Sequence, residues 1–386
     1  MVESESDECQ LRPSPWDAVS TTVAREGLVI QLDGLHAQDM RWLHECLLPG
    51  FQSADGRRVD WRVSLRIDPS AHRALLAAGP AVGGRSRRMF GFQGQDSGCL
   101  EWRDEPLTVL DPEIEVFYRF FSHLASVEIL ASKHRPSVRV ALLRMVREIA
   151  SRHLAHQGQA QFHAAALSHG GQGFLVCGPR RAGKTSFVTH ALLDSASRFI
   201  SNDRAIVAPD MADDGFMLSG MPTLVAIRQG TIDLFPGLPL ARVRHWRARM
   251  TLAEALALPE FASAADKSTK LVLSPVQFCH LLGVQPAAKA PLRALLFPRV
   301  DTAIRGARLT PLARGEVAER LKAELLLPGS DALDSDRLST GSGTSVLDLV
   351  TALSARCPGF ECVLGAGAYL QQSMLSGLSS QSGRTG

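Results

Sequence analysis

Apolar and polar residues alternate in short runs along the first third of the chain, from residue 27 to about residue 130. Examples are Leu28–Leu32, Trp61–Ile67 and Leu107–Leu110. Alternation with a period of two residues is typical of strands that bury one face. We therefore expect a mainly β or α+β region here, although the segment 113–130 fits a strand or a helix equally well.

The period changes after Pro136. From Ser137 to His153, apolar residues recur every three or four positions, which is the spacing of an amphipathic helix packed on a core. Pro136 precedes the helix and Ser137 is a suitable N-cap. The arginines of this segment, including Arg139 and Arg147, fall between the apolar positions, so we expect them to form a solvated face.

Strands and helices follow each other in the remainder of the chain. The apolar segment 161–168, the glycine-rich connection 169–173 and the apolar run 174–177 together predict a hairpin. Further strands are expected at Arg198–Ser201, Ala205–Ala208, Thr223–Arg228, Lys270–Leu273, Leu292–Phe297 and Phe360–Leu364, and helices at Thr251–Ala257 and Val346–Arg356. This order predicts an α/β fold.

Length and composition indicate how the chain divides into domains. The chain has 386 residues, of which 45% are hydrophobic and 21% charged, as in a globular protein with about two domains. The polar ends, 1–20 and 373–386, are expected to be disordered, and the Gly-, Ser- and Asp-rich segment 328–345 to be a flexible loop. We expect an N-terminal α+β domain over 21–135 and a second domain over 136–372.

Charge and cysteine content argue against several classes of protein. A net charge of +3 does not indicate a nucleic-acid partner. No apolar stretch approaches the ~20 residues that cross a bilayer, so no membrane partner is expected. The acidic N-terminus differs from a secretory signal, which begins with basic residues. The seven cysteines contain no CxxC pair, which favours neither disulfides nor a zinc site and suggests a cytoplasmic location.

The most specific motif is an eight-residue phosphate-binding loop pattern, G-x-x-x-x-G-K-[ST]. It is formed by Gly178, Pro179, Arg180, Arg181, Ala182, Gly183, Lys184 and Thr185. An apolar run precedes the pattern and a helical segment follows it, which is the context that the motif requires. The glycines let backbone N–H groups point into one concavity, and the start of the helix adds positive charge.

Each functional group of this loop has an expected task. Lys184 is expected to reach the β- and γ-phosphates of a nucleoside triphosphate, and the Thr185 hydroxyl to hold Mg²⁺. Ser186 is expected to contact the α-phosphate. One helix later, an apolar strand ends in Asn202 and Asp203, and a carboxylate at such a position suits a second Mg²⁺ contact.

This combination resembles the HPr kinase/phosphorylase superfamily, and in particular its shorter HPr-kinase-related members. In those proteins a strand carrying "LHA" precedes the loop, and a strand ending in "SDD" or "ADD" follows it. The counterparts here are Phe162–Ala164, Gly178–Thr185 and Ser201–Asp203, and the resemblance is good over 161–208. It implies a P-loop kinase core with a mixed, twisted sheet, like the HPr kinase C-terminal domain, after a smaller α+β N-terminal region.

The resemblance also implies an activity. Members of the family use ATP and Mg²⁺ to phosphorylate a serine hydroxyl, so the expected acceptor is a protein, a peptide or a small molecule. GTP is the alternative nucleotide, and a homo-oligomer is expected because the classical enzymes assemble. One aspartate of the family's pair acts as base and the other serves the metal, which assigns Asp203 to catalysis and to Mg²⁺. The family position of His163 lies near the γ-phosphate.

The chain departs from the family in two places. Asn202 replaces the first acid, and an amide cannot accept a proton at neutral pH, although its carbonyl oxygen can orient a hydroxyl or water. Three possibilities stay open: Asp203 acts alone, another acid such as Asp210 substitutes, or the chain is an impaired nucleotide-binding module that regulates or scaffolds a partner. Arg180 and Arg181 replace small residues, and either add charge beside the phosphates or point to solvent.

Overall fold

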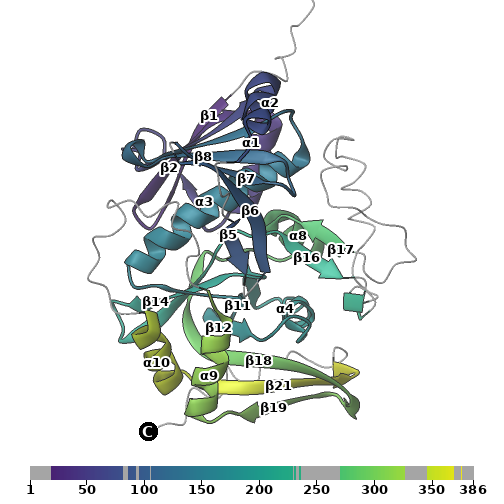
Figure 1. Cartoon of the computed structure of the whole chain (residues 1–386). Coiled ribbons are helices and arrows are strands. Elements are labelled where there is room, and N and C mark those ends of the chain that lie inside the picture. Colours follow the sequence, from purple (N-terminus) through teal and green to yellow (C-terminus); the bar gives the residue numbers. More distant parts are fainter. Residues whose placement is uncertain are drawn as a thin grey trace, which may run out of the picture.

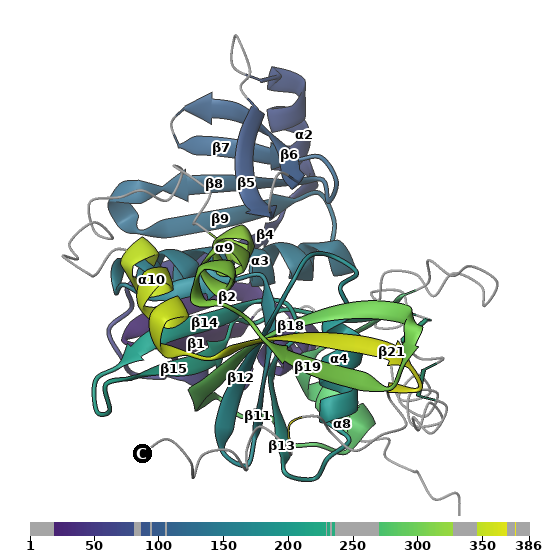
Figure 2. The same ribbon diagram turned by 90° about the horizontal axis from the view of Figure 1, so that it is seen from below.

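Two large mixed sheets and the helices that cover them give the chain an α/β fold, as Figure 1 and Figure 2 show. Among the residues that the structure describes, no helix is long and apolar enough to cross a membrane. The computed structural model describes residues 19–80, 86–92, 95–104, 106–228, 230–231, 234–235, 270–326, 346–368 and 375. The expectations for 1–18, 251–257, 328–345 and 376–386 concern residues outside these ranges.

The N-terminal sheet has nine strands among the described residues, in the order β3-β1-β2-β4-β9-β8-β7-β6-β5. The strands are β1 (Val19–Arg25), β2 (Leu28–Leu35), β3 (Gln52–Ser53), β4 (Trp61–Ile67), β5 (Ser86–Phe92), β6 (Gln95–Asp104), β7 (Leu107–Asp111), β8 (Val116–Phe121) and β9 (Ser126–Ala131). The helices of this region are α1 (Ala37–Leu47), α2 (Pro69–Ala78), the 3₁₀ turn η1 (Ser122–Leu124) and α3 (Pro136–His156). The ambiguous segment 113–130 is therefore two strands joined by a 3₁₀ turn.

Helix α3 packs its predicted apolar face on the N-terminal sheet. Met145 and Ile149 share one apolar cluster with Val63 of β4, and all three are fully buried. The expectation of a solvated arginine face is wrong, because Arg139 and Arg152 are only 3% and 4% exposed. Each of these two arginines has a carboxylate partner: Arg139 contacts Asp39 of α1 at 3.4 Å, and Arg152 contacts Glu148 of α3 itself at 3.6 Å. A charge can leave water where an opposite charge receives it.

The C-terminal sheet has ten strands among the described residues. Its main path is β13-β11-β12-β18-β15-β14-β10-β20, and β21 joins β18 to β19. The strands are β10 (Ala160–Phe162), β11 (Ala164–His169), β12 (Gln172–Cys177), β13 (Ser197–Ser201), β14 (Ala205–Asp210), β15 (Gly215–Gly220), β18 (Lys289–Arg305), β19 (Ala307–Pro311), β20 (Leu325–Leu326) and β21 (Gly359–Ala366). Helices α4 (Lys184–Ala191), α8 (Pro275–Leu282), α9 (Arg314–Glu324) and α10 (Val346–Arg356) accompany it, and β16 (Val225–Arg228) pairs with β17 (Lys270–Leu273) separately.

The predicted hairpin is present, and the strand before it is divided. β11 and β12 are antiparallel, with Ala164 opposite Cys177. The apolar segment 161–168 is two strands rather than one, because β10 pairs with β14 and β20, whereas β11 pairs with β12 and β13. His163 lies at the break, where its N–H donates to the carbonyl oxygen of Glu324 at 2.7 Å.

Candidate functional site

Three sequence-predicted features meet at one edge of the C-terminal sheet. β11 lies between β12 and β13 and is antiparallel to both, so the carboxyl ends of β12 and β13 point in the same direction. The glycine loop follows β12 there, Asn202 and Asp203 follow β13, and His163 precedes β11. The two outer strands are two strand spacings apart, which is roughly 10 Å. The topology therefore brings the loop, His163 and the Asn202–Asp203 pair together.

The backbone of residues 178–183 takes conformations that favour glycine. Gly178, Arg181 and Gly183 have φ values of 149°, 73° and 97°. A Cβ atom on Gly183 would also lie 3.1 Å from Cγ2 of Val300 and 3.4 Å from Cδ1 of Leu364. Both the torsion and the packing thus require glycine at position 183.

Lys184 is the first residue of α4, and its side chain folds back over the loop. Its Nζ donates to the carbonyl oxygen of Gly178 and to that of Pro179 at 3.3 Å. The residue is 9% exposed. Burial lowers the pKa of Lys184, and the negative charges of Glu324 and Asp203 oppose this effect. The negative charges of both carboxylates therefore favour the protonated form of Lys184.

The first turn of α4 has no side-chain cap. Gly183 occupies the N-cap position without a capping hydrogen bond, so the amide groups that begin the helix are open to another acceptor. Thr185 is partly exposed. Ser186 is buried, and its Oγ lies 2.9 Å from Oγ1 of Thr231. The hydroxyl predicted for the α-phosphate is thus already engaged within the protein.

The outer rim of the loop faces solvent. Pro179, Arg180 and Arg181 are exposed, and Ala182 is partly exposed. Of the two possibilities for the arginines, the structure has both side chains on the solvent side. Their effect on a bound phosphate stays a prediction.

His163 joins two carboxylates. Its Nε2 lies 3.4 Å from Oδ1 of Asp203, and its Nδ1 lies 3.0 Å from Oε2 of Glu324. The imidazole side chain is 13% exposed, and that of Glu324 only 6%. Burial by itself would lower the pKa of His163, but the hydrogen bonds with Asp203 and Glu324 outweigh it and raise this pKa.

Asp203 is the more accessible carboxylate, with 36% of its side chain exposed. Desolvation would raise its pKa, but the hydrogen bond and charge of His163, followed by the charges of Arg204 and Arg147, hold this pKa below its usual range. Asp203 is therefore ionised at neutral pH and suits a metal contact or a hydrogen bond from a substrate hydroxyl.

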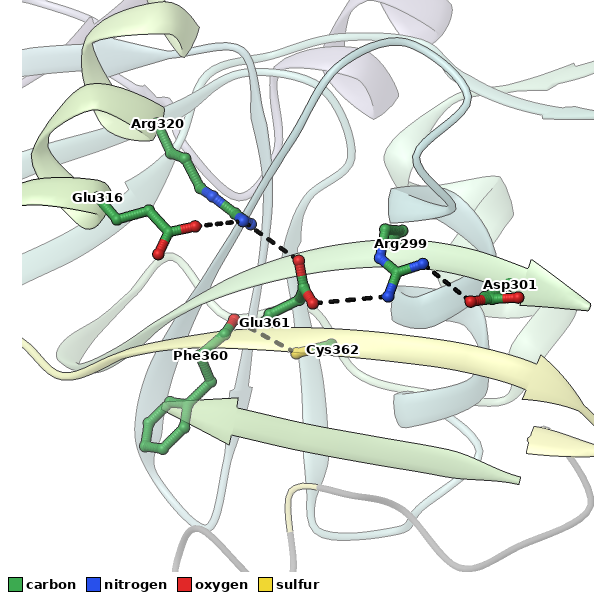
Figure 3. A network of polar contacts seen from close by, with 7 residues as sticks. All are labelled: Arg299, Asp301, Glu316, Arg320, Phe360, Glu361 and Cys362. Carbon is green, nitrogen blue, oxygen red and sulfur yellow. Dashed lines mark hydrogen bonds and ion pairs between the residues drawn. The ribbon is translucent and has the colours of Figure 1, made fainter. Parts of the chain in front are cut away.

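Glu324 carries no sequence signal that marks it as a site residue, because it lies 161 positions after His163. Helix α9 places it, and a network of charges anchors this helix to β21, as Figure 3 shows. Arg320 of α9 contacts Glu316 at 2.6 Å and Glu361 of β21 at 3.2 Å. Arg299 of β18 extends the network, since it also contacts Glu361, at 3.7 Å. Glu324 then supplies both its carbonyl oxygen and its carboxylate to His163.

Asn202 contains a polar atom that the described part of the chain does not satisfy. The residue is 7% exposed, and its Oδ1 has no hydrogen-bond partner among the described residues. An orphaned buried acceptor of this kind costs about 1–3 kcal/mol. A donor or a cation from a ligand would satisfy it.

Asp210 lies too far from Asp203 to substitute for the missing acid, which rules out this one of the three possibilities. It ends β14 on the far side from Asp203, and its Oδ1 accepts from the N–H of Ala212 at 3.0 Å in the following turn. The extended strand from Ala205 to Asp210 separates the two acids by roughly 16 Å or more.

The donor set suits a hard cation such as Mg²⁺. Thr185, Asn202 and Asp203 offer hydroxyl, amide and carboxylate oxygens, which Mg²⁺ prefers. Among the described residues no group of three His, Cys, Asp or Glu side chains could hold a metal alone. A magnesium ion at this edge would therefore share its coordination with phosphate oxygens, as it does in nucleotide complexes.

Comparison with known proteins adds a distant likeness in fold. No protein-family model matches the chain, and no curated protein matches it. A solved structure of the HPr(Ser) kinase/phosphatase from Coxiella burnetii is similar over 57% of this chain and 97% of that chain, with a TM-score of 0.25 and 7% identity. At this TM-score the likeness supports no conclusion about activity.

Proposed function

We propose that the chain is a kinase that uses ATP and Mg²⁺, or GTP in place of ATP, to phosphorylate a hydroxyl group. The observation that carries this proposal is the meeting of the Lys184 loop with the His163–Asp203 pair at one sheet edge. Phosphoryl transfer needs mainly positioning and neutralisation of charge, and this edge offers groups for both.

The loop side would hold the triphosphate. Lys184 would exchange the carbonyl oxygens of Gly178 and Pro179 for phosphate oxygens, because a charged acceptor makes a stronger hydrogen bond than a neutral one. The amide groups at the start of α4, which have no side-chain cap, would donate to the same phosphates. Thr185 and Asp203 would hold Mg²⁺, with Asn202 Oδ1 as a further oxygen ligand. When bound, this ion neutralises charge on the phosphates.

The acid–base side would hold the acceptor. Asp203 would orient the acceptor hydroxyl and take its proton as the hydroxyl oxygen bonds to the γ-phosphorus and the bond to the β-phosphate oxygen breaks. In a loose transition state this proton leaves late, so a carboxylate of low pKa is an adequate base. His163 would share the charge of Asp203, and Glu324 would fix the orientation of the imidazole.

The test separates nucleotide binding from transfer. We expect calorimetric titration with MgATP to give a dissociation constant that Lys184→Met weakens at least tenfold, because the methionine keeps the volume and removes the charge. Lys289→Met, which removes an exposed lysine of β18, is the matched control and should stay within twofold. Absence of heat with both MgATP and MgGTP would overturn the proposal.

Transfer is measured with radiolabelled γ-phosphate against serine-containing peptides and small hydroxyl compounds. Labelling that depends on Lys184 supports the kinase. Nucleotide binding without labelling of any acceptor would instead support the regulatory or scaffolding module.

A further inference from the structure

Strand β18 continues beyond the end of β12, to Arg305, and β21 and β19 continue beside it. Figure 1 and Figure 2 show these three strands extending together away from the rest of the C-terminal sheet. We call this extension the arm, and it comprises residues 298–305, 307–309 and 362–366. The residues that we assign to phosphate, Mg²⁺ and proton transfer all lie outside the arm.

The arm lies on the side of β12 that is opposite the acid–base residues. In the sheet, β11 and β13 follow on one side of β12, and β18 and β21 follow on the other. β12, β18 and β21 are parallel, so their carboxyl ends point to the same edge of the sheet. A triphosphate that directs its γ-phosphate from the loop toward Asp203 therefore has its α-phosphate end on the side of the arm.

The arm meets the loop through Val300. A Cβ atom on Gly183 would lie 3.1 Å from Cγ2 of Val300, and one on Gly178 would lie 3.8 Å from the carbonyl oxygen of Pro298. Leu364 of β21 pairs with Val300 and approaches Gly183 as well, at 3.4 Å. Leu364 is 2% exposed, whereas Val300 is 50% exposed. The arm therefore presents an apolar side chain to solvent directly beside the loop.

The other face of the arm is charged. Arg299 points away from the face that carries Val300, because successive residues of a strand alternate between the two faces. It contacts Asp301 at 3.0 Å and Glu361 at 3.7 Å, as Figure 3 shows. A single exposed apolar residue is ordinary in proteins. The position of Val300 at the α-phosphate end of the loop is what gives it an expected occupant.

We infer that the nucleoside part of the bound triphosphate packs against Val300. This inference rests on the proposed function and extends it to the part of the nucleotide that the loop does not hold. Base and ribose present apolar surface, and removal of this surface from water stabilises the contact. The side chain of valine forms no hydrogen bond, so the contact accepts adenine and guanine alike.

The experiment compares the nucleotides with a ligand that consists of the phosphates alone. MgATP, MgGTP and magnesium tripolyphosphate are titrated separately into the full chain, and binding is followed by calorimetry. Val300→Thr keeps the shape and the β-branching of the side chain but replaces a methyl group with a hydroxyl group. We expect this variant to bind both nucleotides about fivefold more weakly and to bind tripolyphosphate as the wild type does.

Two further variants serve as controls. Val300→Leu keeps an apolar side chain, so the affinity for both nucleotides should stay within about twofold of the wild type. Leu193→Thr changes an apolar residue that is 53% exposed and follows the far end of α4, and it should leave the binding of all three ligands unchanged.

Tripolyphosphate separates contact with the nucleoside from support of the loop. If Val300 served only to hold Gly183 in place, Val300→Thr would weaken all three ligands equally, and the inference would be overturned. Unchanged binding of both nucleotides would overturn it as well, and a loss for one nucleotide alone would contradict a purely apolar contact. If none of the three ligands binds the wild type, the proposed function fails and the inference fails with it. Because binding needs no acceptor, the result can be read even if the chain transfers no phosphate.

Discussion

The loop side of the candidate site comes from one continuous segment, Cys177–Ser186, whereas the acid–base side brings together residues from three separate segments, at His163, Asp203 and Glu324. Local backbone conformation determines the geometry of the loop side, whereas the packing of α9 and β13 determines the geometry of the acid–base side. Changes to the loop should therefore affect nucleotide binding, while changes around His163 should affect proton transfer and the dependence on pH.

The largest effect that would sharpen this comparison is expected from Asp203→Asn. The substitution keeps the volume and removes the carboxylate that we assign to proton transfer, so the rate of transfer should fall by about 10²–10⁴-fold. Binding of ATP without Mg²⁺ should remain within a few-fold. Steady-state kinetics and calorimetry measure the two effects. Asp210→Asn at the far end of β14 is the control, and an equal loss in this variant would contradict the assignment.

Gly183→Ala tests whether the loop conformation is as demanding as the torsions indicate. The φ of 97° and the contact at 3.1 Å with Val300 should together cost about 1–2 kcal/mol in the free energy of unfolding. Denaturant titration measures this cost. Gly315→Ala in the first turn of α9 meets no atom within 4 Å and should be neutral or stabilising. If both variants unfold alike, the loop is less constrained than the structure indicates.

Glu324→Gln is expected to change the pH dependence with little effect on nucleotide binding. The folded protein raises the pKa of His163 above 6.5. The protonated imidazole and its two carboxylate partners therefore stabilise the fold fully below pH 6.5, and this contribution to the free energy of unfolding is lost as pH rises through the folded pKa. The variant should therefore lose most stability near about pH 5.5 and resemble the wild type at alkaline pH.

Imidazole NMR should show a lower pKa for His163 in Glu324→Gln. Glu319→Gln is the matched control, because this glutamate lies on the same helix with its side chain 74% exposed and outside the Arg320 network. If the pKa of His163 is the same in Glu324→Gln as in the wild type, Glu324 does not influence the acid–base residues.

The smallest effect is expected from Arg320→Met, which removes the centre of the network in Figure 3. Partly exposed ion pairs contribute about 0–1 kcal/mol, so the loss of stability should not exceed this range. The NMR signal of His163 should nevertheless shift, because α9 carries Glu324. Lys322→Met, in an exposed pair with Glu319, should leave this signal unchanged.

The difference between the two sides also explains how much could be predicted from sequence. The hairpin, the loop and the helix after it depend on neighbouring residues, and their pattern predicts them. His163 interrupts an apolar run that contains no breaker, so the run gives no sign that the strand divides there. Glu324 and the partners of Arg139 come from distant segments, and single-sequence periodicity contains no information on such pairing.

Strand β1 of the N-terminal sheet contacts β15 of the C-terminal sheet. Arg25 of β1 is buried and donates to the carbonyl oxygen of Gly220 at 2.5 Å and to Ser219 Oγ at 3.0 Å. Met221 completes the apolar cluster of the N-terminal sheet. Separating the two regions ahead of β10 would leave these groups facing water, so we expect the two regions to melt cooperatively, which calorimetry would show as a single transition.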